Sequence, residues 1–388
     1  MRILIITTEY PPAVGGIGSF AATITRGLKA LGDSVEVIAT GRREEREPDL
    51  SQAKSRLLEK RGFKLLPLTG RSAISCWRQR PDVTIAMTWT HEGIVALILR
   101  CTFGIPYVVV AHGSEILRHS QSRPAGALLR LIFRRALFVS ANSSYTMRLV
   151  QGLKVARQVT VVNPPIDLDQ WQTASPHGNE DVNAAFGLNG KTVLFTAGRL
   201  VPRKGHLIVI QALARLRERF PDLVFVFTGT GEYQDVLEQE AHKLGVSNAL
   251  RMLGELSQTT LRSMFWRTDI YVSPTLQIGN DVEGFGIALV EAAVCGKAII
   301  AGRSGGTEDA VVNGETGLLL DIVDVDGITA SIALLIYQPE LRAKLGTKAR
   351  KRALQRFGIN KQIAAFRLIV CQTLNQAELA QRADSQTT

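Results

Sequence analysis

The sequence predicts an α/β protein of two domains, each built on a buried parallel β-sheet. Short, fully apolar runs recur along both halves of the chain, and they end in polar or glycine-containing turns. Such runs are typical of parallel strands that helices cover on both faces. With 388 residues the chain is too long for one compact core and suits two domains of ordinary size.

The first predicted element is a strand at residues 3–6, which leads through a Pro-bearing turn into a glycine loop at residues 15–18. Apolar residues then recur at helical spacing, namely Phe20, Ile24, Leu28 and Leu31. A glycine loop between a strand and a helix can bind phosphate at the helix N-terminus. A dinucleotide-binding fold is not indicated, because a Pro-bearing insert precedes the glycines and no acidic residue ends the second strand, residues 35–38.

Two further strands are predicted at residues 83–87 and 107–111, and each is followed by a polar turn that holds a histidine, His91 or His112. Ligand sites in open α/β sheets lie at the carboxyl ends of strands. We therefore interpret His112 as a functional residue, and not as a turn histidine whose hydrogen bonds are satisfied by its neighbours. For His91 both interpretations stay open.

A polar linker at residues 172–183 precedes a second series of strands. These are predicted at residues 192–196, 223–227, 298–301 and 318–321. The chain is thus divided into an N-terminal domain, residues 1–171, and a C-terminal domain, residues 184–357. The charged segment at residues 42–57 is predicted to be a loop or an exposed helix.

The second domain contains a loop, residues 279–286, with two carboxylates and glycines that runs directly into an apolar helix. The backbone N–H groups of residues 284–286 should point out of the N-terminus of this helix and form an anion site. Glu283 at the loop and Glu291 in the helix are expected to lie about 12 Å apart along the helix axis. This separation fits the opposite ends of one elongated ligand.

The spacing of these two glutamates, the Glu-Gly-Phe-Gly sequence and the later Ser304-Gly305-Gly306 resemble the signature of glycosyltransferase family 4. Residues 11–16 are similar to the Pro-Pro-x-x-Gly-Gly segment of that family. The resemblance implies the GT-B fold, in which two Rossmann-like β/α/β domains face a central cleft and a C-terminal helix, here about residues 358–388, packs back on the first domain. It also implies transfer of a sugar from a nucleoside diphosphate sugar to an acceptor hydroxyl, with retention of configuration and without a metal or other cofactor.

The resemblance further implies a role for each site residue. Lys204 and Arg199 reach the two phosphates of the donor, for which a lysine point charge and a forked guanidinium are suited. Glu283 holds the donor sugar, Glu291 grips the ribose, and His112 contacts the sugar near the reacting centre. The expected catalytic residues are His112, Arg199, Lys204 and Glu283. The expected donor-binding residues are Gly15, Gly16, Gly198, Gly229, Leu253, Gly284, Phe285, Gly286, Ile287 and Glu291. Candidate acceptor-binding residues are Tyr10 and His91.

The net charge of +11 is concentrated in the first half, where residues 1–185 carry 23 Lys and Arg against 15 Asp and Glu. A basic surface favours an anionic partner such as nucleic acid, a phosphorylated substrate or anionic lipid. No nucleic-acid-binding motif is present. An anionic membrane surface is therefore the favoured partner, and a merely solvated basic surface is an equal alternative. Arg71, Trp77, Arg78 and Arg80 mix basic and aromatic side chains in a region that the resemblance places at the membrane in members with lipid acceptors.

The sequences of these motifs are most similar to those of GDP-mannose-dependent phosphatidylinositol mannosyltransferases, which implies a lipid-linked or glycan acceptor. UDP-glucose, UDP-galactose and UDP-N-acetylglucosamine remain open as donors. A nucleotide-sugar epimerase, an NAD-dependent oxidoreductase and a non-catalytic nucleotide-sugar binder are the rival functions. Because no long apolar run and no signal-peptide pattern are present, we expect a cytoplasmic protein, peripheral on the inner face of the membrane if it binds lipid.

Overall fold

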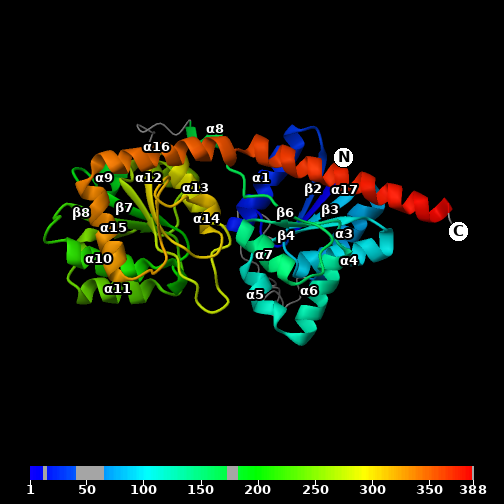
Figure 1. Ribbon diagram of the computed structural model, residues 1–388, viewed down its shortest axis with the longest axis horizontal. Coiled ribbons are helices and arrows are strands. Elements are labelled where there is room, and N and C mark those ends of the chain that lie inside the picture. Colours follow the sequence, from blue (N-terminus) through cyan, green and yellow to red (C-terminus); the bar gives the residue numbers. More distant parts are fainter. Residues whose placement is uncertain (12–14, 41–64, 173–181, 387–388) are drawn as a thin grey trace, which may run out of the picture. The chain divides into compact units, whose positions relative to one another are not determined.

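The computed structural model describes residues 1–11, 15–40, 65–172 and 182–386, which form two compact units (Figure 1). Unit 1 comprises Met1–Pro165 and Ile359–Thr388, and unit 2 comprises Ile166–Gly358. The predicted linker, residues 172–183, and the motif at residues 11–16 lie partly outside the described residues. The charged segment at residues 42–57 lies wholly outside them.

The first boundary between the units differs from the predicted end of the first domain at residue 171. Residues 166–171 belong to unit 2 because they pack there. The N–H of Ile166 donates to the carbonyl of Phe357 at 2.8 Å. The ring of Trp171 meets the ring of Phe265 edge to face, with 5.3 Å between centroids. These contacts place residues 166–171 in unit 2, although the predicted polar linker comes after them in the sequence.

Unit 1 is built on a six-stranded sheet in the order β2-β1-β3-β4-β5-β6. All neighbouring strands are parallel. The strands are β1 (Arg2–Thr7), β2 (Ser34–Ala39), β3 (Val83–Ala86), β4 (Tyr107–Ala111), β5 (Val139–Ala141) and β6 (Val159–Val161). Their carboxyl ends lie at one edge, so the polar turns that follow them meet there.

Helices accompany the strands of unit 1. They are α1 (Gly16–Ala30), α3 (Leu65–Gln79), α4 (His91–Phe103), α5 (Ser114–Ser120), α6 (Arg123–Arg135), α7 (Ser144–Gly152) and the last helix of the chain, α17 (Ile359–Gln386). Helix α17, red in Figure 1, packs along α1. A Cβ atom added to Gly27 of α1 would lie 2.6 Å from Ile363 Cγ1, so the absence of a side chain lets the two helices approach.

Unit 2 has a second six-stranded sheet, in the order β12-β11-β10-β7-β8-β9. It is parallel throughout. The strands are β7 (Thr192–Ala197), β8 (Leu223–Thr228), β9 (Leu250–Met252), β10 (Ile270–Ser273), β11 (Ala298–Gly302) and β12 (Leu318–Leu320). Two parallel α/β sheets, each accompanied by helices, are the architecture that the sequence predicts.

The helices of unit 2 include two short 3₁₀ turns. They are α8 (Leu168–Gln172), α9 (Val182–Phe186), η1 (Pro202–Lys204), α10 (His206–Leu216), α11 (Gln234–Lys243), η2 (Ser247–Ala249), α12 (Gln258–Arg267), α13 (Ile287–Val294), α14 (Thr307–Ala310), α15 (Val325–Tyr337) and α16 (Pro339–Arg356). Among the helices described in either unit, none has the length and apolar content needed to cross a bilayer.

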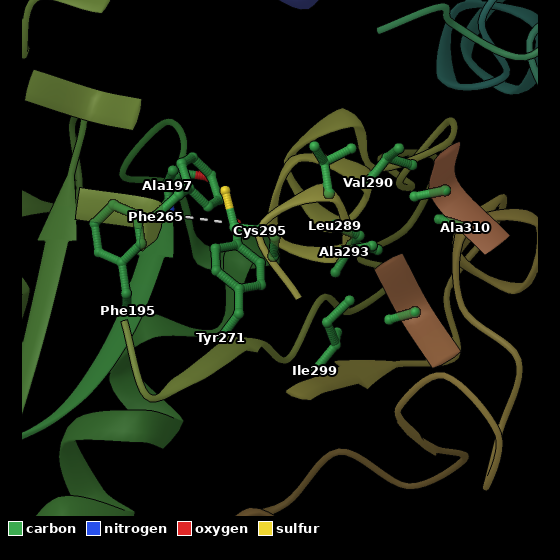
Figure 2. Packing of buried hydrophobic residues seen from close by; sticks show 14 of the residues in the cluster. Phe195, Ala197, Phe265, Tyr271, Leu289, Val290, Ala293, Cys295, Ile299 and Ala310 are labelled. Carbon is green, nitrogen blue, oxygen red and sulfur yellow. Dashed lines mark hydrogen bonds between the residues drawn. The ribbon is translucent and has the colours of Figure 1, made fainter. Parts of the chain in front are cut away.

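Helix α13 is held by one of the two large hydrophobic clusters of unit 2 (Figure 2). The rings of Phe195 and Tyr271, from β7 and β10, pack against Phe265 with centroid distances of 5.2 and 5.4 Å. Leu289 and Val290 of α13 are fully buried in the same cluster. Because most of its surface is apolar and buried, α13 is fixed on the sheet, and so is the loop that leads into its N-terminus.

Candidate active site

The predicted site residues of unit 2 follow the carboxyl ends of its strands. Gly198 and Arg199 come directly after β7, Gly229 follows β8 and Leu253 follows β9. Residues 283–286 lie between β10 and α13, and Lys204 ends η1. The parallel topology therefore brings side chains from four separate loops to one edge of the sheet.

The glycines of this edge allow two loops to touch through their backbones. A Cβ atom on Gly229 would lie 2.1 Å from the carbonyl oxygen of Gly198. A Cβ atom on Gly198 would lie 3.4 Å from Lys204 Cε, and Gly198 has a φ of +149°, which favours glycine. The loop after β8 thus supports the loop after β7, which in turn lies against the side chain of Lys204.

Glu283 is the centre of a cluster of charged side chains. Its Oε2 accepts hydrogen bonds from Lys204 Nζ at 2.6 Å and from Arg203 Nη1 at 2.8 Å. Arg203 also has its Nε 3.2 Å from Asp281 Oδ1. Burial opposes ionisation of Glu283, but the two cations outweigh it and lower its pKa to about 2. Glu283 is therefore a hydrogen-bond acceptor at neutral pH and not a proton donor.

Arg203 was missed by the sequence analysis, although it stands next to Lys204. Its side chain is largely buried and lies between the carboxylates of Asp281 and Glu283. The signal in the sequence was the excess of charge in two loops: adjacent cations at residues 203 and 204, and two carboxylates at residues 281 and 283. Opposite charges in loops that follow neighbouring strands are candidates for pairing, but which ones pair depends on side-chain geometry.

The backbone around Glu283 is also fixed. The carbonyl of Glu283 accepts the N–H of Gly306 at 2.8 Å. A Cβ atom on Gly305, whose φ is +59°, would lie 2.1 Å from the same carbonyl oxygen. The N–H groups of Gly284, Phe285 and Gly286 donate no hydrogen bond to another described residue. They lie beside the N-terminus of α13, where the sequence analysis predicts an anion site.

Glu291 lies in an environment different from that of Glu283. It is the one charged residue of α13, and its carboxylate accepts no hydrogen bond from the described residues. Burial raises its pKa to about 7, and the charge of Arg262 offsets this only in part. Its side chain is partly exposed, as are Leu253 and Ile287, whereas Arg199 is exposed and makes no ion pair with a described residue.

In unit 1, His112 follows β4 and is held in one tautomer. Its Nε2 lies 2.7 Å from the carbonyl oxygen of Met87. A carbonyl can only accept, so Nε2 carries the proton. Nδ1 of the neutral ring is then an acceptor, and no described residue donates to it. The backbone N–H of His112 donates to Glu115 Oε1 at 2.7 Å, which fixes the turn.

Two buried asparagines continue this arrangement along the edge of the unit 1 sheet. Asn142 Nδ2, after β5, donates to the carbonyl of His112 at 3.3 Å. Asn163 Nδ2, after β6, donates to the carbonyl of Asn142 at 3.1 Å. Neither asparagine was predicted as a site residue. Asn163 precedes two prolines, and its side chain secures the turn that they form.

The remaining predicted residues of unit 1 lie at the same edge. Gly15 precedes α1 and Gly16 is its first residue. A Cβ atom on Gly15 would lie 2.5 Å from Glu9 Oε2, so the carboxylate of Glu9 lies against the glycine loop. Tyr10 packs partly on the core, and His91 is the first residue of α4 and partly buried.

Glu92, not His91, is the buried polar residue of this turn. Its carboxylate accepts the N–H and the hydroxyl of Thr8, both at 2.7 Å, and the hydroxyl of Thr88 at 2.5 Å. It thereby ties the turn after β1 to the turn after β3. A carboxylate ahead of the apolar run of α4 was the available signal. No group of three His, Cys, Asp or Glu side chains suited to a metal ion occurs in the described parts of either unit.

Comparisons with known proteins agree with this architecture. Residues 14–170 match the family model described as Glycosyltransferase Family 4, and residues 179–352 match the model described as Glycosyl transferases group 1. The chain is 29% identical over 360 residues to a GDP-mannose-dependent alpha-(1-6)-phosphatidylinositol monomannoside mannosyltransferase of Mycolicibacterium smegmatis. The match covers 91% of this chain and 94% of the relative. It is 28% identical over 403 residues to the glycogen synthase of Mycobacterium tuberculosis, with 92% of this chain and 91% of that protein covered.

Two solved structures show the same fold. Sucrose-phosphate synthase from Thermosynechococcus elongatus has a TM-score of 0.78 at 18% identity, with 97% of this chain and 100% of that chain covered. HepE of Anabaena in complex with UDP and glucose has a TM-score of 0.75 at 22% identity, with 94% and 99% covered. Since the two family models match both halves of the chain and the solved structures share its fold, the chain belongs to glycosyltransferase family 4 and is a glycosyltransferase with the GT-B fold.

Proposed function

We propose that the enzyme transfers a mannosyl group from GDP-mannose to a hydroxyl group of a lipid or glycan, with retention of configuration and without a metal ion. One observation carries the assignment of the site: Lys204, Arg203 and Glu283 meet beside the N-terminus of α13. The donor is proposed because several relatives are described as GDP-mannose-dependent mannosyltransferases. A UDP-sugar is the second candidate, since HepE, with the same fold, is described in complex with UDP.

In this proposal Lys204, the exposed Arg199 and the free N–H groups of residues 284–286 bind the two phosphates of the donor. These groups are fixed before the reaction and oppose the charge that develops on the departing diphosphate. Glu283 accepts hydrogen bonds from sugar hydroxyls. Glu291 is partly exposed, and no described residue donates a hydrogen bond to its carboxylate, so it can accept hydrogen bonds from the ribose hydroxyls.

Retention of configuration often involves a carboxylate nucleophile. Glu283 is a poor candidate for that role, because its Oε2 already accepts from two cations. We therefore favour front-face attack. The acceptor oxygen forms a bond to the anomeric carbon, the bond from that carbon to the phosphate oxygen breaks, and the leaving phosphate takes the acceptor proton.

His112, Gly15 and Gly16 are the proposed donor contacts of unit 1. Nδ1 of His112, left as an acceptor by the bond from Nε2 to Met87, is suited to a hydroxyl of the donor sugar. Gly15 and Gly16 lie at the N-terminus of α1, where backbone N–H groups can bind a phosphate of the donor. Tyr10 and His91 lie at the same edge of the sheet and are proposed acceptor contacts.

An anionic membrane surface is the proposed partner of unit 1. Helix α3 exposes Leu66, Ile74 and Trp77, which are 68%, 56% and 75% accessible. Residues 66, 70, 74 and 77 recur at helical spacing and share one face. Arg71 and Arg78 are exposed on the same helix. Apolar side chains flanked by arginines suit the headgroup region of an anionic bilayer, which would make the enzyme peripheral on the membrane.

The membrane proposal is tested with lipid vesicles and tryptophan fluorescence. Trp77 is the exposed tryptophan, since Trp89 and Trp171 are buried and Trp266 is partly buried. Phosphatidylglycerol vesicles should shift the emission of the wild type to the blue, whereas phosphatidylcholine vesicles and the Trp77→Ser variant should show no shift. Equal binding to both vesicle types would contradict the proposal.

The donor is tested by thermal shift with GDP, UDP, ADP, NAD and the matching sugar nucleotides. A ligand that binds the native state raises the melting temperature by mass action. A shift confined to GDP and GDP-mannose supports the proposal, and a shift confined to UDP-sugars replaces the donor while retaining the site.

The site residues are tested by substitution. Lys204→Ala and Glu283→Ala should each abolish transfer in folded protein, and near-normal rates in both variants would refute the assigned site.

A further inference from the structure

The proposed function gives Lys204 a phosphate to bind, yet in this structure the Lys204 ammonium is already occupied. Its Nζ is 2.6 Å from Glu283 Oε2. Arg203 Nη1 lies 2.8 Å from the same oxygen atom. All three side chains are largely buried, with 14% of Lys204, 7% of Arg203 and 13% of Glu283 accessible. Two cations thus share one oxygen of one buried carboxylate.

This duplication matters when Lys204 turns to another anion. Removing one partner of a buried ion pair is strongly unfavourable when it leaves the other charge unpaired. If Lys204 were the only cation beside Glu283, moving its ammonium to a phosphate would strand the carboxylate. Because Arg203 stays at 2.8 Å, Glu283 keeps a charged hydrogen-bond donor after Lys204 has left.

The two cations differ in their freedom to move. The Arg203 guanidinium lies between Glu283 and Asp281, and its carbonyl accepts the N–H of Leu276 at 2.8 Å. Lys204 has one ion-pair partner, Glu283, among the described residues, and the stem of its side chain lies against Gly198, which offers no side chain to hold it. Arg203 is therefore anchored, whereas Lys204 can exchange partners by rotating its own stem.

We propose that Arg203 is a positioning residue: it holds Glu283 in place so that Lys204 can exchange Glu283 for the diphosphate of the donor. The inference rests on the proposed role of Lys204 in binding phosphate. Among the described residues, the side chain of Arg203 makes ion pairs with Glu283 and Asp281, and in this proposal it acts on the donor through its neighbours. Without Arg203, Lys204 would be retained by Glu283 and would bind the diphosphate weakly.

The test measures binding of GDP, with UDP in parallel, to the intact chain by titration calorimetry, because a nucleoside diphosphate has no sugar for Glu283 to hold. Lys204→Met should weaken binding about tenfold or more, as expected for loss of a charged phosphate contact. Arg203→Gln should weaken binding by a similar factor, although residue 203 does not contact the ligand. Arg203→Lys should retain most of the affinity, since a cation still pairs with Glu283.

Two double variants separate this exchange from a simple change of charge. Arg203→Gln with Glu283→Gln removes the carboxylate that retains Lys204 and should restore the affinity to within about threefold of the wild type. Arg203→Gln with Asp281→Asn restores the same net charge but leaves Glu283 in place, and it should bind as weakly as Arg203→Gln alone. A merely structural role of Arg203 would not distinguish these two variants.

Several results would overturn the proposal. Wild-type affinity of Arg203→Gln would show that Lys204 needs no help in leaving Glu283. Equal recovery in both double variants would assign the effect to net charge. If Lys204→Met binds both nucleotides as tightly as the wild type, the proposed phosphate site itself fails, and the exchange fails with it. Thermal unfolding of each variant confirms that the folded protein is being titrated.

Discussion

At the scale of single residues, Glu283 and Glu291 are two carboxylates in opposite electrostatic environments. The charges of Lys204 and Arg203 overcome burial and keep the pKa of Glu283 at about 2. Glu291 makes no ion pair with a described residue, and burial raises its pKa to about 7, which the charge of Arg262 offsets only in part. One carboxylate is therefore ionised at every physiological pH, whereas the other changes charge close to neutrality. Perturbed carboxylates of this kind are typical of ligand sites.

Glu291 should make nucleotide binding depend on pH. A carboxylate that accepts two ribose hydroxyls must be ionised, so the ligand binds the deprotonated form of Glu291. The affinity of the free enzyme for GDP or UDP should then fall roughly tenfold per pH unit below about 7 and level off above it. The measurement is a titration at several pH values. Glu291→Gln should bind more weakly than the wild type at pH 8 and with little pH dependence, and an unchanged profile in this variant would remove Glu291 from the site.

The same residue should reduce stability in the absence of ligand. Glu291 binds its proton more tightly in the folded chain than in the unfolded chain, so the free energy of unfolding falls as the pH rises from about 4.5 to about 7. Because Glu291 is partly exposed, we expect a modest effect: Glu291→Gln should raise the melting temperature of unit 2 at pH 8 by about 2–4 °C, or about 1 kcal/mol. At pH 5 the gain should largely disappear. Scanning calorimetry at both pH values decides the matter.

A site residue could be predicted from the sequence where a local motif contains it. It could not be predicted where its role depends on contacts between two loops that are far apart in the sequence. Glu283 and Lys204 were found through separate local patterns. That they bind each other, and that Arg203 joins them, follows from the order of β7 and β10 in the sheet. Asn142 and Asn163 likewise gain their contacts only when β4, β5 and β6 are neighbours.

At the scale of elements, the loops of the unit 2 edge depend on close backbone approach. Gly305 and Gly314 both have left-handed φ values, +59° and +71°. A Cβ atom on Gly305 would lie 2.1 Å from the carbonyl oxygen of Glu283, whereas one on Gly314 would have nothing within 4 Å. The two positions therefore share the conformational strain of a side chain at positive φ but differ in the clash.

This difference gives a matched pair of variants. Gly314→Ala should lower stability by about 1 kcal/mol through φ strain alone and leave transfer near the wild-type rate. Gly305→Ala should add displacement of the Glu283 loop and reduce the transfer rate about a hundredfold, since a shift of about 1 Å at a site can have that effect. Steady-state rates of folded protein test the pair. Equal rates in both variants would mean that the loop after β11 does not position Glu283.

The strands were easier to predict than the helices because their signal is local. The apolar runs at residues 3–6, 107–111 and 223–227 correspond to β1, β4 and β8 to within about a residue at each end. The apolar run that begins at Ala136 becomes a strand only at Val139, because α6 ends at Arg135 and the turn between them takes up residues 136–138. Apolar residues in such a turn cannot be told from a strand by hydropathy, since all three of these residues pack on the core.

At the scale of the whole molecule, the N-terminus and the last helix of the chain meet in unit 1. The buried carboxylate of Asp33 accepts from the N-terminal ammonium of Met1 at 2.9 Å and from Arg367 of α17 at 2.7 Å. Burial opposes its ionisation, but these two cations lower the pKa of Asp33 below its ordinary value. The resulting stabilisation is present above the ordinary carboxyl pKa and is lost as the pH falls through the lowered value. The packing of α17 on unit 1 was expected from the family resemblance alone, because the local sequence of a helix does not determine which sheet it packs against.

Helix α17 should therefore stabilise unit 1, although unit 2 precedes it in the chain. Phe366 is fully buried in the unit 1 core, with its ring 6.1 Å from that of Phe138, whereas Leu368, two residues later, is 57% accessible. Phe366→Ala should reduce the free energy of unfolding of unit 1 by about 3–5 kcal/mol, and Leu368→Ala should change it by less than about 0.5 kcal/mol. Hydrogen exchange read peptide by peptide locates the effect. For Phe366→Ala we expect faster exchange in β1, β2 and α1 and unchanged exchange in β7 and β8. Destabilisation of the unit 2 strands by the same variant would show that α17 supports both units.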